Sequence, residues 1–112
     1  MRILYHLVLQ AALKKPPQIK VIATEKGSFS GMQNDALFKQ LIKSGTNEEH
    51  FVNLVSILLS QKDIALDLGG NIGTHSMTMS KIVRKGKVFT FEPQSLTFSI
   101  LQNNILLQKC EN

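Results

Sequence analysis

One segment constrains the possible folds of this chain more than any other: the apolar run Ile64 to Leu68 and the glycine-rich GGNIG that follows it directly. The run has the length of a buried strand and is too short for a typical globular helix. The glycines after it permit a sharp backbone turn. Thr74 then opens a helix predicted to continue to about Arg84. A strand that turns through glycines into a helix is typical of open α/β sheets, which bind ligands at that turn.

A second strand and helix follow at short intervals. Lys87 to Phe91 (KVFTF) reads as a strand closed by Glu92 and Pro93, and Ser95 to about Lys109 reads as a helix. Gly86 is expected to end the preceding helix in a left-handed conformation. Strand, helix, strand and helix with short links predict a parallel sheet. The expected fold class is therefore α/β, with a partial Rossmann-like parallel βαβα unit.

Smaller elements are predicted upstream of this unit. Ile19 to Thr24 is rich in β-branched residues, Glu25 to Ser28 is turn-like, and Phe29 to Met32 returns as a second strand. These segments form a hairpin ahead of the main fold, and Asp35 to Lys43 is a short helix candidate. The run Ile3 to Leu13 is predicted to be a helix that docks on the domain.

The next helix carries a start signal and an apolar stripe. Thr46 and Glu49 have capping-box spacing, in which each side chain bonds to the backbone N–H of the other. Helical spacing then gives an apolar face that is expected to pack on a sheet; its members are Phe51, Leu54, Val55, Leu58 and Leu59.

Composition narrows the class of protein. A chain of 112 residues suits one domain. Lys and Arg number 13 against 8 Asp and Glu, but they are spread along the chain, and the densest group lies where a helix ends, where cations are favourable. A solvated face is therefore favoured over nucleic-acid or membrane binding.

Ile3 to Leu13 is too short to span a bilayer and is a poor match to a signal peptide. Cys110 is the single cysteine, which fits a reducing compartment, and a cytoplasmic location is expected.

The turn after Leu68 has the features of a ligand site. Gly69 and Gly73 let the backbone approach a ligand, and the helix from Thr74 directs unpaired N–H groups at the same point, where they can hold a carboxylate. Glu92 ends the second strand about 20 residues on, the placement of an acid that binds ribose hydroxyls. The alternative is a plain tight turn with a solvated Glu92.

The loop sequence also bears on the kind of ligand. A dinucleotide fingerprint reads GxGxxG and leaves room for a pyrophosphate, which Asp67, two residues before the first glycine, would repel. No Gly-Lys-Ser/Thr follows, so a phosphate-binding P-loop is excluded. Asp67 can instead face an ammonium or a sulfonium, directly or through water. The charge pattern favours a zwitterionic amino-acid cofactor over NAD.

These residues carry a resemblance. The segments ALDLGGNIGTHSMTMSKIV, GKVFTFEP and LQNNILLQ closely resemble the FkbM family of methyltransferases, over about Ile64 to Gln108. The family pattern is Asp-x-Gly-Ala/Gly-Asn-x-Gly, then Phe-Glu-Pro, then a helix with Leu-x-x-Asn. Gly70 stands where alanine is common, a change expected to be harmless, and His75 stands where an aromatic residue is frequent.

The resemblance implies S-adenosylmethionine as cofactor and O-methylation of a saccharide or small metabolite. It implies cofactor-binding roles for the loop, the next helix and the end of the second strand: Asp67, Gly69, Gly70, Asn71, Gly73, Ser76, Glu92 and Pro93. No metal is expected. Residues 1–45 would be a lead-in segment, and residues 46–112 the first part of the cofactor-binding domain.

Several questions stay open at this stage. The family's sheet has seven strands, and this chain supplies two of the parallel ones, so a truncated or partial sequence is expected, without the adenine-contacting and acceptor-binding parts. No general base is assigned, since His6 and His50 lie on predicted helices and are more simply packed or solvated. A non-catalytic remnant or interaction module and, less favoured, an NAD-dependent oxidoreductase remain alternatives. The acceptor and the oligomeric state are not determined.

Overall fold

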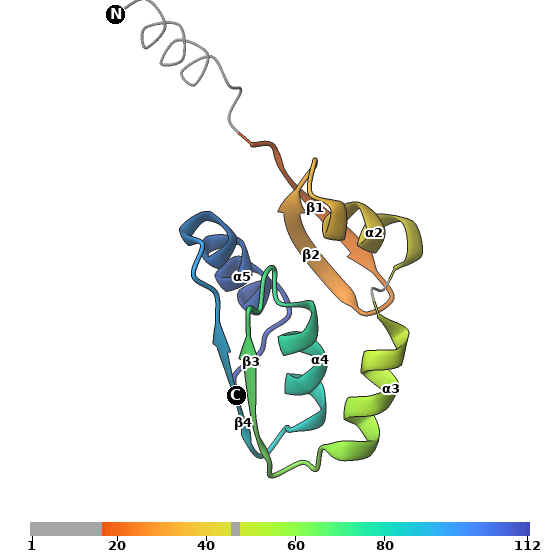
Figure 1. Cartoon of the computed structure of the whole chain (residues 1–112), viewed down its shortest axis with the longest axis vertical. Helices are drawn as coiled ribbons and strands as arrows, with labels where there is room; N and C mark the ends of the chain where they lie inside the picture. Colours follow the sequence, from red (N-terminus) through yellow and green to blue (C-terminus); the bar gives the residue numbers. More distant parts are fainter. Residues whose placement is uncertain (1–16, 46–47) are drawn as a thin grey trace, which may run out of the picture.

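The computed structural model describes residues 17–45 and 48–112 (Figure 1). The docking helix predicted within Ile3 to Leu13 and the capping residue Thr46 lie outside these ranges. In chain order the described elements are β1 (Ile19–Thr24), β2 (Gly27–Met32), α2 (Ala36–Ser44), α3 (Glu49–Leu58), β3 (Ile64–Leu68), α4 (Thr74–Ile82), β4 (Lys87–Phe91) and α5 (Ser95–Leu107). In the described part of the chain, no helix is both long and apolar enough to span a bilayer.

The predicted hairpin is confirmed. β1 pairs antiparallel with β2, from Ile19 opposite Met32 to Thr24 opposite Gly27. β2 (GSFSGM) consists mainly of glycine and serine. A Cβ on its Gly31 would lie 2.2 Å from the Phe38 ring. The absence of that Cβ is what lets Phe38 of α2 lie directly against the strand.

The short helix predicted over Asp35 to Lys43 is confirmed as α2, shifted by one residue and capped at both ends. The Asp35 side chain accepts a hydrogen bond from the Phe38 backbone N–H at 2.9 Å, which satisfies one of the unpaired donors of the first turn. Gly45 adopts a left-handed conformation (φ 67°), and its N–H donates to the Leu41 carbonyl. These caps fix the helix at both ends.

The following helix, α3, differs from its prediction in two ways. Glu48 is its N-cap residue, with a left-handed backbone (φ 59°) and no side-chain capping bond. Of the predicted apolar stripe, Val55 is buried, whereas Leu54 and Leu58 are 53% and 66% exposed. The stripe therefore packs along one edge only, where Val55 meets Ala65 of β3 and Met79 of α4.

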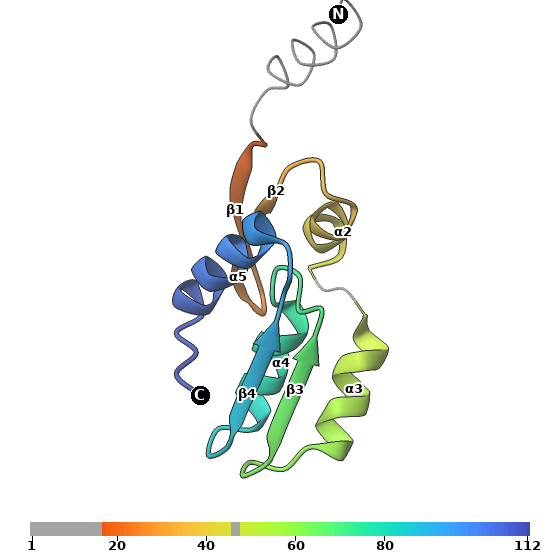
Figure 2. The same ribbon diagram turned by 60° about the vertical axis from the view of Figure 1, so that its left-hand side comes forward.

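The parallel unit is confirmed. β3 pairs in parallel with β4, from Ile64 opposite Lys87 to Leu68 opposite Phe91, and α4 connects the two strands. Figure 2 shows the strands side by side with α4 behind them and α3 at one side. This arrangement confirms the predicted α/β fold class with a parallel βαβα unit.

Gly86 does not have the predicted left-handed conformation; α4 ends at Ile82, and Val83 is its C-cap residue. A glycine is required at this position for a steric reason, since a Cβ would lie 1.8 Å from the Asp63 carbonyl oxygen. The turn before β3 therefore passes directly against the turn before β4.

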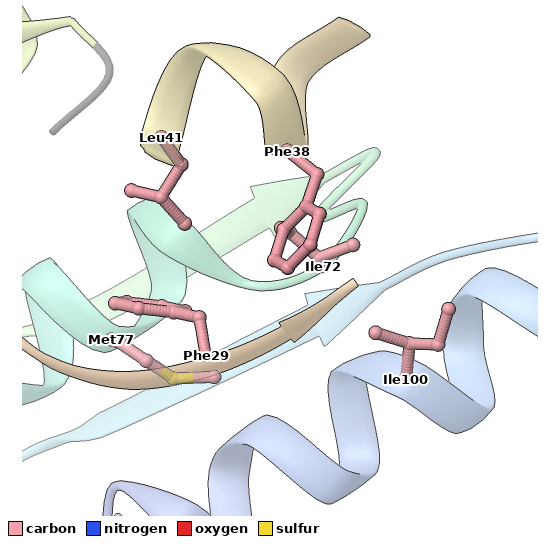
Figure 3. Close-up of a cluster of buried hydrophobic side chains, with 6 residues drawn as sticks. All are labelled: Phe29, Phe38, Leu41, Ile72, Met77 and Ile100. Carbon is pink, nitrogen blue, oxygen red and sulfur yellow. The ribbon is translucent and has the colours of Figure 1, made fainter. Parts of the chain in front are cut away.

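The main hydrophobic core joins the hairpin to the parallel unit (Figure 3). It contains side chains from β2, α2, the glycine loop, α4 and α5, namely Phe29, Phe38, Leu41, Ile72, Met77 and Ile100. Ile72, the apolar residue within GGNIG, is only 1% exposed. The loop is thus anchored in the core by one of its own side chains.

The face of the β3–β4 pair that points away from α3 and α4 is largely exposed among the described residues. Large apolar side chains project from it with exposed fractions between 46% and 77%: Ile64, Leu66, Leu68, Phe89 and Phe91.

Candidate functional site

The glycine loop closes onto the carboxyl end of β4. The backbone N–H groups of Gly69 and Gly70 both donate to the Phe91 carbonyl, at 2.9 and 3.0 Å. The N–H of Gly73 donates to the Gly70 carbonyl at 2.8 Å, which folds the loop into a tight turn before α4. The ends of the two parallel strands and the start of α4 therefore meet at one point, as the sequence order predicted.

Two of the glycines have left-handed backbones that favour glycine. Gly69 has φ 83° and Gly73 has φ 93°. No atom lies within 4 Å of the position that a Cβ of Gly69 would take. Bare backbone therefore borders open space at the carboxyl end of β3, which is where a ligand of an α/β sheet approaches.

Gly70 has a stricter requirement than the sequence suggested. A Cβ at this position would lie 2.2 Å from the Thr90 methyl group and 3.2 Å from a Leu101 methyl group. Glycine, expected to be harmless where alanine is common, fits this position, whereas alanine does not fit unless Thr90 moves. The loop is therefore packed against β4 and α5 from below.

Asp67 is directed inward from β3, toward α4, and is 9% exposed. Its Oδ2 accepts a hydrogen bond of 2.5 Å from the Ser76 hydroxyl, which in turn accepts one of 2.8 Å from the Thr90 hydroxyl. Ser76 lies on the first turn of α4, as predicted. This chain of hydroxyl groups fixes the carboxylate beneath the loop and occupies one of its oxygens.

Glu92 lies at the end of β4, half-buried, and reaches back to the loop. Its Oε2 accepts a hydrogen bond from the Asn71 backbone N–H at 3.0 Å, and its Oε1 accepts one from the Gln94 N–H at 2.9 Å. Asn71 has a left-handed backbone (φ 49°). Pro93, next to Glu92, is exposed. The structure therefore brings Glu92 to the rim of the same loop that Asp67 supports.

Asn104 is a functional candidate that the site prediction did not include. It is the asparagine of the Leu-x-x-Asn pattern on α5, it is completely buried, and its side chain bonds to the Ile72 carbonyl of the loop. The signal available in the sequence was an amide at a position of the helix that packs inward. Helical periodicity alone does not mark this position, because an apolar residue would satisfy the same spacing.

Two of the histidines, His50 and His75, lie within the described residues. His75 stacks on Phe51 with a ring-centroid distance of 3.8 Å, and its Nε2 lies 2.8 Å from Glu48 Oε2 without the alignment of a hydrogen bond. His75 therefore packs between α4 and α3. His50 is exposed on α3, and His6 lies outside the described residues.

A separate cavity of about 270 Å³ lies between the hairpin, α2, α3 and α4. Phe29, Leu41 and Met77 contribute apolar walls, and Thr74 and His75 form part of its lining. None of the predicted cofactor residues is among those that line it. This cavity is therefore distinct from the glycine loop.

The chemical character of the loop suits a ligand that carries a carboxylate, hydroxyl groups and a positive charge. The open backbone at Gly69 leaves room for close approach, and the first turn of α4 is a favourable place for a carboxylate. Glu92 supplies carboxylate oxygens suited to hydroxyl groups, and Asp67 supplies negative charge below the loop.

Comparison with solved structures gives a similarity in fold. No protein-family model and no curated protein matches the chain. A solved structure of a SAM-dependent O-methyltransferase from Thermotoga maritima is similar, with a TM-score of 0.51 and 18% sequence identity. The match covers 91% of this chain and 40% of that enzyme, so this chain spans well under half of its length. At this level of identity the similarity shows the fold.

Proposed function

We propose that this chain forms the S-adenosylmethionine-binding first part of a methyltransferase of the FkbM type, which methylates a hydroxyl of a saccharide or small metabolite. One observation carries the proposal: the glycine loop, with open space beside Gly69, meets Glu92 at the carboxyl ends of two adjacent parallel strands. The similarity in fold to an O-methyltransferase supports it. In this proposal residues 46–112 begin the cofactor domain, and residues 1–45 lead into it.

Each loop residue has a distinct binding task in this proposal. The backbone of Gly69 to Gly73 and the first turn of α4 receive the amino-acid carboxylate of the cofactor. Glu92 accepts hydrogen bonds from the ribose hydroxyls. Asp67 stabilises the cofactor's positive charge from below, with a water between them, because its carboxylate is buried and bonded to Ser76.

The bound cofactor supplies an electrophilic methyl group on a sulfonium, and transfer is an in-line displacement. The contribution of the protein is then mainly to position the two reactants. No described residue is assigned to the acceptor or to a general base. Partners are expected to be a small molecule or saccharide rather than nucleic acid, and the single Cys110 fits the cytoplasm as the proposed location.

A calorimetric titration with S-adenosylhomocysteine tests the proposal. The wild-type chain is expected to bind, and Glu92→Gln to bind about tenfold more weakly, since ribose loses a charged acceptor. Glutamine retains one oxygen for the Asn71 N–H of the loop and loses only the bond from the Gln94 N–H outside it. Glu111→Gln, which changes an exposed acid near the end of the chain, is the matched control and should bind as the wild type does.

Two outcomes would remove this function. One is the absence of binding heat at millimolar S-adenosylhomocysteine. The other is saturable binding of NAD, measured by fluorescence, which would support the oxidoreductase alternative instead.

A non-catalytic interaction module is the second candidate, and the exposed apolar face of β3 and β4 favours it. The two functions are separated by the same titration. An interaction module has no requirement to bind S-adenosylhomocysteine. The methyltransferase must bind S-adenosylmethionine, and S-adenosylhomocysteine, the product left after methyl transfer, is expected to bind at the same site.

A further inference from the structure

The side-chain amide of Asn104 on α5 is completely buried, and all of its hydrogen-bonding capacity is used. Its Oδ1 accepts from the Ser30 backbone N–H at 2.6 Å and from the Ser30 hydroxyl at 2.7 Å. Its Nδ2 donates to the Ser30 carbonyl at 2.9 Å and to the Ile72 carbonyl at 2.8 Å. An amide has two N–H donors and one oxygen with two lone pairs, so this side chain has no capacity left.

The bond to Ile72 fixes one particular peptide group. The peptide that joins Ile72 to Gly73 has its carbonyl held by Asn104 and its N–H held by the Gly70 carbonyl at 2.8 Å. With both ends bonded, this peptide cannot rotate without breaking a hydrogen bond. It immediately precedes α4, so its orientation decides the direction of the N–H groups in the first turn of that helix.

The rest of the loop is held from a different element. The N–H groups of Gly69 and Gly70 bond to the end of β4, and Asn71 bonds to Glu92. Asn104 therefore links α5 and β2 to the loop by side-chain hydrogen bonds, in addition to the apolar contacts of Leu101 and Ile100. It supplies the second fixed end of a segment whose first end is set by β4.

We propose that Asn104 is a positioning residue for cofactor binding: its amide holds the Ile72–Gly73 peptide in the binding orientation before the ligand arrives. The inference rests on the proposed function and assigns to this residue the pre-organisation of that site. Pre-organisation raises affinity because less conformational entropy is lost on binding.

The role requires an amide. In Asn104→Asp a carboxylate replaces the Nδ2 donor, so oxygen atoms face the carbonyls of Ser30 and Ile72 and both bonds are lost. Ser30→Ala is the matched control. It removes the hydroxyl that donates to Oδ1 and accepts from the Asn103 amide, but leaves the two backbone bonds of Ser30 and the Ile72 bond in place. Both variants lose buried hydrogen bonds, but only the first releases the loop.

The test is calorimetric titration of S-adenosylhomocysteine into both variants, well below their unfolding temperatures. Asn104→Asp is expected to weaken binding by about tenfold or more, and Ser30→Ala to stay within about twofold of the wild type. A purely structural role predicts that affinity follows the unfolding temperature in both variants alike. Equal affinity losses, or no loss in folded Asn104→Asp, would overturn the inference.

Hydrogen exchange in the wild type provides a test that does not depend on any variant folding. The Gly73 amide is expected to exchange as slowly in the free protein as the buried amides of α4, because its bond exists before the ligand arrives. Rapid exchange that slows only on adding S-adenosylhomocysteine would contradict pre-organisation. If the wild type binds no S-adenosylhomocysteine, the proposed function fails, and slow Gly73 exchange then supports only the order of the loop.

Discussion

The two faces of the β3–β4 pair differ both in composition and in surroundings, and the face with the larger apolar side chains is the more exposed one. On the inner face Ala65 and Asp67 are 6% and 9% exposed, covered by α3 and α4. On the outer face Leu66 and Leu68, their neighbours in the same strand, are 64% and 77% exposed. Strands that are apolar on both faces are typical of parallel sheets covered on both sides. The composition of a strand therefore reports the environment it suits, while its contribution to stability depends on the atoms that actually cover it.

The largest expected effect comes from placing the same charge on each face. Ala65→Asp puts a carboxylate into the cluster with Val55 and Met79, and we expect a loss of about 3 kcal/mol or more in the free energy of unfolding. Leu66→Asp, one position along, should cost less than about 1 kcal/mol because the side chain stays in water. Urea denaturation measures both. Equal losses would show that the outer face is covered in solution.

A smaller effect is expected where the inner face meets the glycine loop. Gly70→Ala should cost about 1–3 kcal/mol, because its Cβ overlaps the Thr90 methyl group. Thr90→Ser removes that methyl group and keeps the hydroxyl that donates to Ser76. In a double-mutant cycle, Gly70→Ala should therefore cost much less in the Thr90→Ser background. Additive losses would mean that Thr90 is not the obstacle.

The smallest effect on unfolding is expected from making the outer face polar. Leu66→Thr combined with Phe89→Thr should change the free energy of unfolding by about 0.5 kcal/mol or less, but should reduce self-association, since exposed apolar patches promote it. Sedimentation velocity over a range of concentrations measures the change. Val21→Thr, on the exposed hairpin strand β1, is the control and should leave association unchanged. If Val21→Thr reduced self-association and the double variant did not, the associating surface would lie on the hairpin.

The sequence predicted the elements of the described part well because their signals are local. Strand-length apolar runs, helical periodicity and the order of the elements all depend on residues close together in the chain, and the structure has these elements close to where they were expected. The structure also brings Asp67, Ser76 and Glu92 to one loop, as the order of strand, helix and strand requires.

Apart from the N-cap of α3 and the backbone conformation of Gly86, the differences from expectation concern contacts between distant segments. The requirement for glycine at Gly86 comes from the Asp63 carbonyl, and the one at Gly70 comes from Thr90. The apolar stripe of α3 is half exposed because only one edge of it meets α4 and β3. Spacing along a helix shows which residues share a face, but not how much of that face another element covers.

The sequence by itself determined the order of strands and helices and the position of the glycine loop, because backbone freedom and apolar periodicity are properties of neighbouring residues. Only the tertiary structure decided that Asp67 lies beneath the loop and that Asn104 holds the loop from α5. The bonds of Asn104 to Ser30 and Ile72 span 74 and 32 positions of the chain. Hydrogen bonds of that kind exist only after the core has brought these segments together.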